Sequence, residues 1–102
     1  MDVELARRQW EDGSRRIEDA RADRRRYALL LERVEVVVDA LRRRVGQTFT
    51  LAELADAYEG ADEWARPLLE GDHPGAPAVP EAGTVADAAF HVYARGASDY
   101  AP

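Results

Sequence analysis

The sequence predicts an all-α protein with one long N-terminal helix, packed by a short helical hairpin and a C-terminal helix. Three observations support this fold class. Apolar residues recur at three- and four-residue spacing from Val3 to Val45, a strong helix start follows at Thr50, and a proline- and glycine-rich segment, 71–83, precedes the last helical pattern. A length of 102 residues suits one modest hydrophobic core.

The first predicted element runs from Val3 to Val45 and follows a heptad pattern with weak points at Gly13 and Arg24. If it is continuous, this helix is roughly 65 Å long at 1.5 Å per residue, longer than a compact body of this size. The two interleaved series are Val3, Trp10, Ile17, Arg24, Leu31, Val38 and Val45, and Ala6, Gly13, Ala20, Tyr27, Val34 and Leu41.

The width of the apolar stripe predicts a division of this element. From Tyr27 onward the stripe is broad, as is typical of a helix covered by several neighbours, whereas before Arg24 it is narrow and flanked by charges. We therefore predict a helical, coiled-coil-like arm at 1–24 and a small helical domain at 25–102 with a loop at 71–83. The predicted protein-contact edge of the arm consists of Val3, Ala6, Trp10, Ile17, Ala20 and Arg24.

A second interpretation of the N-terminal segment stays open. Asp12-Gly13 is a strong turn pair, so the chain can instead fold back there and bring Trp10 into its own core. Without such a turn, Trp10 and Ile17 need a cover, because burying each contributes about 2 kcal/mol.

The hairpin has the clearest local signals. Thr50 and Glu53 form a capping box, and Phe49 and Leu54 occupy the two positions of a hydrophobic staple. Gly60 is expected to end this helix in the left-handed conformation. A second short helix is expected from about Asp62, and Pro67 is expected to bend or restart it.

The last element is a helix at about 85–95, ended by Gly96. Thr84 and Asp87 are interpreted as its capping box. Its apolar face is predicted to cover the broad stripe of the first helix, and the tail at 97–102 is expected to fray unless Tyr100 packs. The face consists of Ala86, Ala89, Phe90 and Tyr93.

Charge argues against nucleic acid as the main partner. Residues 1–46 carry 12 Arg against 10 acids, whereas residues 47–102 carry 2 Arg against 10 acids. The segment 48–64 resembles the start of a helix-turn-helix, but the would-be reading helix begins with Asp62 and Glu63, and phosphates repel acids. Most N-terminal arginines have an acid three or four residues away, which predicts ion pairs along the helix.

Catalytic and metal-binding patterns are lacking. The chain has no cysteine and two histidines, His73 and His91, without metal-ligand spacing, and no glycine-rich phosphate loop. His91 stands four residues from both Asp87 and Arg95, which we interpret as a surface ion ladder. We expect no enzyme activity, no cofactor and no metal. Lacking a secretory signal and a long apolar run, the chain is expected to be cytoplasmic and not membrane-bound.

Two segments, "LRRRVGQTFTLAELADAYEGADEWA" and "VADAAFHVYARGASDY", are similar to a group of small uncharacterised helical proteins of actinobacteria. The resemblance covers roughly residues 27–100. It implies a cytoplasmic helical protein with a partner, and it transfers no activity and no site residues.

These observations predict a non-enzymatic protein-interaction or regulatory protein. It would self-associate as a homodimer, or dock another protein, through its N-terminal amphipathic helix. The alternative is a nucleic-acid-associated regulator that uses the N-terminal arginines and the helix-turn-helix-like hairpin.

Overall fold

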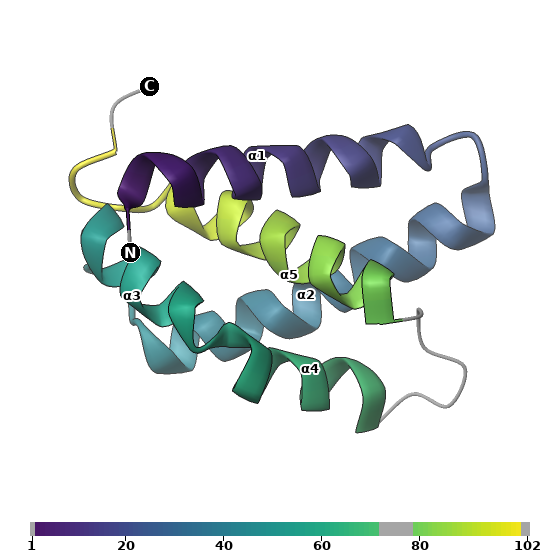
Figure 1. Cartoon of the computed structure of the whole chain (residues 1–102). Coiled ribbons are helices and arrows are strands. Elements are labelled where there is room, and N and C mark those ends of the chain that lie inside the picture. The colour runs from purple at the N-terminus through teal and green to yellow at the C-terminus, as the bar shows by residue number, and fades with distance from the viewer. Residues whose placement is uncertain (1, 72–78, 101–102) are drawn as a thin grey trace.

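The computed structural model describes residues 2–71 and 79–100, which form five helices and, within these ranges, no strand (Figure 1). The prediction of an all-α fold is therefore confirmed. The helices are α1 (Val3–Asp19), α2 (Arg24–Arg44), α3 (Leu51–Glu59), α4 (Ala61–Gly71) and α5 (Val79–Ala94). Among them, none combines the length and the apolar character that a membrane span requires.

The chain turns at residues 20–23, between α1 and α2. The backbone N–H of Ala20 donates to the Ile17 carbonyl at 3.0 Å, and the Asp23 side chain caps α2 by accepting from the Arg26 N–H at 3.1 Å. The prediction of one continuous helix from Val3 to Val45 is therefore wrong. The alternative turn at Gly13 is also wrong, because Gly13 lies inside α1.

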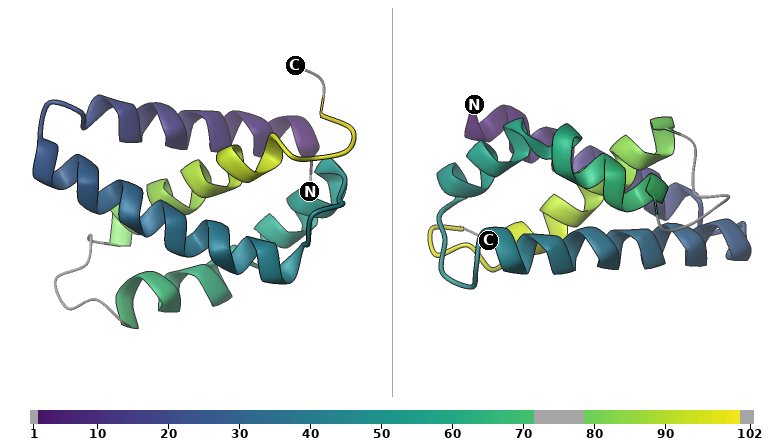
Figure 2. Two further views of the ribbon diagram at one scale, coloured as in Figure 1. Left: turned by 180° about the vertical axis from the view of Figure 1, so that it is seen from behind. Right: turned by 90° about the horizontal axis from the view of Figure 1, so that it is seen from below.

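The C-terminal helix α5 occupies the centre of the fold. It contacts each of the other four helices, and the views show it between α1 and α2 (Figure 1 and Figure 2). Of the remaining two helices, α3 also contacts α1 and α4 also contacts α2. The radius of gyration is 12.9 Å, close to the value of about 13 Å for a compact chain of this length. Within residues 2–71 and 79–100, no segment projects as an arm.

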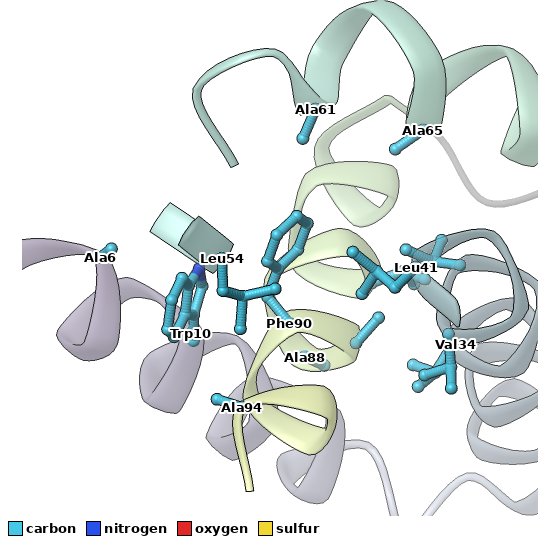
Figure 3. Close-up of a cluster of buried hydrophobic side chains, with 14 of the residues drawn as sticks. Ala6, Trp10, Val34, Leu41, Leu54, Ala61, Ala65, Ala88, Phe90 and Ala94 are labelled. Atoms are coloured by element: carbon cyan, nitrogen blue, oxygen red, sulfur yellow. The ribbon is translucent and has the colours of Figure 1, made fainter. Parts of the chain in front are cut away.

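Trp10 lies inside this core. Its side chain is 1% exposed, and its ring stacks on Phe90 at 5.7 Å and meets Tyr58 edge-on at 5.8 Å. Trp10, Leu54 and Phe90 point toward one another (Figure 3). The division into an arm at 1–24 and a domain at 25–102 is therefore wrong, because α1 contributes to the same cluster of buried residues as the other helices.

The predicted hairpin is confirmed as α3 and α4. The Glu53 N–H donates to the Thr50 hydroxyl at 3.2 Å, and the Thr50 N–H donates to the Glu53 carboxylate at 3.3 Å. Gly60 ends α3, and α4 begins at the next residue. Pro67 lies inside α4 without interrupting it.

The start of α5 differs from the prediction. The helix begins at Val79, so residues 79–83 of the predicted loop are helical, and Thr84 with Asp87 does not cap its start. The remainder of that loop, 72–78, which includes His73, lies outside the described residues. The segment after α5 does not fray. It packs against the rest of the molecule up to Tyr100. The Ser98 N–H donates to the Phe49 carbonyl, and Asp99 accepts from the Leu51 N–H, each at 2.7 Å.

Candidate functional site

Two adjoining cavities lie beside α5 and share three lining residues, Tyr58, Gly83 and Asp87. We call them together the Asp87 groove. The first cavity, of about 430 Å³, is also lined by Glu59, Ala61, Asp62 and Ala86. The second, of about 420 Å³, is also lined by Gln9, Asp12, Gly13, Arg16 and Thr84.

Gly13 sets the spacing of the two helices that carry much of this groove. A Cβ atom built at position 13 would lie 2.4 Å from the Asp87 Cβ and 2.9 Å from the backbone nitrogen of Ala88. Only a residue without a side chain allows α1 to approach α5 so closely. The weak point in the heptad pattern is thus a point of close contact between α1 and α5.

Three helices meet at the hydroxyl of Tyr58. The hydroxyl, on α3, is hydrogen-bonded to Oδ1 of Asp87 on α5, and lies 3.0 Å from Oε1 of Gln9 on α1. The side chains of Gln9, Tyr58 and Asp87 are all partly buried. This cluster therefore joins α1, α3 and α5 at the place where the two cavities adjoin.

The environment of Asp87 disfavours its ionised form. Burial raises the pKa of the Asp87 carboxyl to about 6, and repulsion from Asp12 and Asp62 acts in the same direction. The hydrogen bond from Tyr58 and the charge of Arg16 oppose this increase in pKa. Burial, together with the neighbouring Asp87, also raises the pKa of the Tyr58 hydroxyl. Asp87 therefore changes charge near pH 6.

The two cavities of the groove differ in the charges that line them. In the second cavity Arg16 is paired with Asp12, with Nε and Oδ2 2.9 Å apart. The charged residues lining the first cavity are all acids, namely Glu59, Asp62 and Asp87. Within the described ranges, no group of three or more His, Cys, Asp and Glu side chains is placed to hold a metal ion. Chemically, the groove can exchange a proton and accept hydrogen bonds from a donor.

His91 occupies a different position from the predicted surface ladder. Its Nδ1 lies 2.7 Å from the Ser14 hydroxyl, across the contact of α1 with α5. Burial lowers the pKa of the imidazole, and the charge of Arg95 does the same, whereas Glu11 acts in the opposite direction. Neither His91 nor Ser14 lines the Asp87 groove. The pair connects the two helices.

The structure does not place the predicted contact edge on the surface. Four of its members, Ala6, Trp10, Ile17 and Ala20, are buried, and Val3 is partly buried against the core, while Arg24 is exposed at the start of α2. The physical reason is that α5 of the same chain covers the apolar stripe of α1. The prediction that this edge is free to bind a partner is therefore wrong.

Several N-terminal arginines form the predicted ion pairs with acids three or four residues away, in α1 and in the turn that follows it. Arg7 lies 3.7 Å from Glu4, Arg16 2.9 Å from Asp12, and Arg21 3.3 Å from Glu18, measured between the nearest nitrogen and oxygen atoms. The first turn of α4 carries Asp62 and Glu63. The absence of DNA binding by the α3–α4 pair stays a prediction.

The residues of the Asp87 groove are absent from the predicted site. Gln9, Tyr58 and Asp87 are far apart in the sequence, and packing brings them together. One local signal existed, because Asp87 is an acid set within the small apolar residues Ala86, Ala88 and Ala89 of a helix.

Comparison with known proteins assigns no family to the chain, because no family model, no curated protein and no solved structure matches it. The resemblance to small actinobacterial proteins stays a prediction.

Proposed function

We propose that this protein is a non-enzymatic binding module whose Asp87 groove receives a positively charged side chain of a partner protein. The proposal keeps the predicted class of function, docking to another protein, and moves the contact site. Self-association through the N-terminal stripe forms no part of it, because α5 covers that stripe.

The state of Asp87 is the observation that carries the proposal. Its carboxyl is partly buried between two cavities; burial raises its pKa, and repulsion from the acids Asp12 and Asp62 acts in the same direction. The negative potential of these two acids, which favours a proton on this carboxyl, also favours another cation beside it. A cation that enters the groove restores the ionised carboxylate and removes the repulsion.

The first cavity is large enough to receive a side chain. Its volume of about 430 Å³ lies within the range of about 300–1,000 Å³ that is usual for ligand pockets. A guanidinium group offers several N–H donors in one plane, which suits a lining of carboxylates and a phenol oxygen. We therefore propose an arginine side chain as the preferred occupant.

The overall charge supports the same type of partner. Residues 47–102 carry 10 acids against 2 Arg, and this region contributes Tyr58, Asp62 and Asp87 to the groove. Such an excess of negative charge attracts a basic partner over a distance of about 8–10 Å at physiological salt.

We also propose a cytoplasmic location, which the cysteine-free sequence supports because reducing compartments lack structural disulfides.

An NMR titration with N-acetyl-arginine amide tests the proposal, and the uncharged citrulline analogue is the matched control ligand. We expect arginine to shift the backbone amide signals of Tyr58, Asp62 and Asp87, and citrulline to shift them far less. Asp87→Asn removes the charge and retains an oxygen for Tyr58, so it should weaken binding at least several-fold.

Glu35→Gln serves as the control variant, because it makes the same change of charge at an exposed position on α2. It should bind like the native protein. Equal binding of arginine and citrulline, or native affinity in Asp87→Asn, would overturn the proposal.

A further inference from the structure

The Tyr58 hydroxyl has one proton to donate and two side-chain oxygens beside it, Oδ1 of Asp87 and Oε1 of Gln9. When Asp87 is ionised, the proton goes to its carboxylate, and the oxygen of Gln9 then faces a hydroxyl that cannot donate to it. Gln9 restores a hydrogen bond in that state only by turning its amide, so that the side-chain N–H donates to the Tyr58 oxygen.

Protonation of Asp87 reverses these roles. The carboxylic acid then donates to the Tyr58 oxygen, and Tyr58 donates to Oε1 of Gln9, so that a single chain of hydrogen bonds connects the three residues. The structure places Oε1 of Gln9 3.0 Å from the Tyr58 hydroxyl, within reach of the second hydrogen bond that this chain requires.

We infer that Asp87, Tyr58 and Gln9 form a hydrogen-bond relay that reverses direction when Asp87 changes charge, and that this reversal turns the Gln9 amide in the second cavity. Reversal requires no ligand. Its use as a regulatory device rests on the proposed function, because a cation in the first cavity would hold Asp87 ionised. The second cavity would then be lined by the side-chain oxygen of Gln9 instead of its nitrogen.

The groups that face Asp87 from the surrounding helices determine the balance between the two states. Burial of the carboxyl favours the protonated form most, and Asp12 on α1 and Asp62 on α4 act in the same direction, whereas the hydrogen bond from Tyr58 on α3 and Arg16 on α1 favour the ionised form. These effects oppose one another, so that the relay can change direction near pH 6. Coupling between the two cavities is then reciprocal, as it must be for linked binding equilibria.

The test follows side-chain signals by NMR between pH 4.5 and 8, without any ligand. We expect the Gln9 side-chain amide and the Asp87 carboxyl carbon to shift with one common midpoint. Gln47 is the other glutamine of the chain, is exposed, and lies outside the Asp87 groove, so its amide signal should stay constant.

Two variants complete the experiment. In Tyr58→Phe the Gln9 amide should lose its response while Asp87 still titrates, and in Asp87→Asn the response should vanish without any loss of the Tyr58 hydroxyl. A Gln9 amide that ignores the titration of Asp87, or that responds unchanged in either variant, would overturn the relay. Because no ligand is present, a failure of arginine to bind leaves this result unaffected, and the two proposals fail separately.

Discussion

The backbone of α1 at Gly13 lies directly against Asp87 on α5, so closely that a Cβ atom at position 13 would stand 2.4 Å from the Asp87 Cβ. This contact has two consequences. It holds α1 and α5 together, and it places Asp87 beside Gln9, Asp12 and Tyr58. Stability and the candidate site therefore depend on the same glycine.

Gly13→Ala is expected to destabilise the protein by about 1–3 kcal/mol, because the new methyl group overlaps Asp87 and the backbone of Ala88 and forces the helices apart. The loss should outweigh the gain of at most about 1 kcal/mol that alanine brings to a helix interior. Urea unfolding followed by circular dichroism measures the difference.

Gly83→Ala is the matched control, because Gly83 also lies inside a helix but has no atom within 4 Å of a built Cβ. It should leave the free energy of unfolding unchanged or raise it by about 0.5–1 kcal/mol. Equal effects of the two substitutions would show that α1 and α5 are not in close contact at Gly13.

Trp10→Ala should lower the free energy of unfolding by about 3–5 kcal/mol, because it empties a site enclosed by Phe90, Tyr58 and Leu54. Leu5→Ala in the same helix removes a side chain that is 44% exposed, and it should cost far less. Chemical denaturation of both variants decides the point. A small effect at Trp10 would support a free N-terminal helix over the compact fold described above.

The charge of Asp87 should make stability depend on pH. Its pKa rises from 3.8 in the unfolded chain to about 6 in the folded protein, so the folded state binds this proton more tightly. The stabilising contribution is complete below pH 4 and is lost as the pH rises through 6.

At pH 8, Asp87→Asn should therefore be more stable than the native protein by on the order of 1 kcal/mol, a value that allows for solvent screening of a partly exposed group. The difference should shrink at pH 4.5. Thermal unfolding across this range, with Glu35→Gln as a charge-matched control, measures it. A difference between Asp87→Asn and native protein that is independent of pH would refute a raised pKa at Asp87.

Local sequence signals predicted a helix end well where the sequence carries recognisable capping residues. The capping box of Thr50 and Glu53 is present as expected, because a cap depends on groups within four residues. Gly60 ends α3, but the predicted left-handed conformation is wrong, because its φ is −95°. The start of α5 at Val79 was missed, because Thr84 and Asp87 match a cap pattern although they lie inside the helix.

The position of α1 could not be predicted from the same signals. A heptad stripe shows that an apolar surface must be covered, but it does not specify whether a partner or the chain itself covers it. The turn at 20–23 contains neither glycine nor proline, and Ala20 is buried there. The Asp23 cap of α2 is one local signal there, but the heptad pattern continues through it, so packing of α1 against α5 was needed to recognise the turn.

The candidate site depends still more on packing. Gln9, Tyr58 and Asp87 come from three helices, and the pattern within any one of these helices does not indicate that the three side chains meet. The environment of Arg33 also could not be predicted from the sequence. Its place on α2 suggests a solvated charge, yet its side chain is buried, and its Nε and Nη1 atoms make no hydrogen bond.

The pKa of Asp87, measured by NMR with and without saturating N-acetyl-arginine amide, tests the central claim most directly. If the groove binds a cation beside this carboxylate, the bound cation must favour the ionised form, and the midpoint should move well below 6. The citrulline analogue should leave the midpoint in place. An arginine complex in which Asp87 titrates as it does in the free protein would contradict the account.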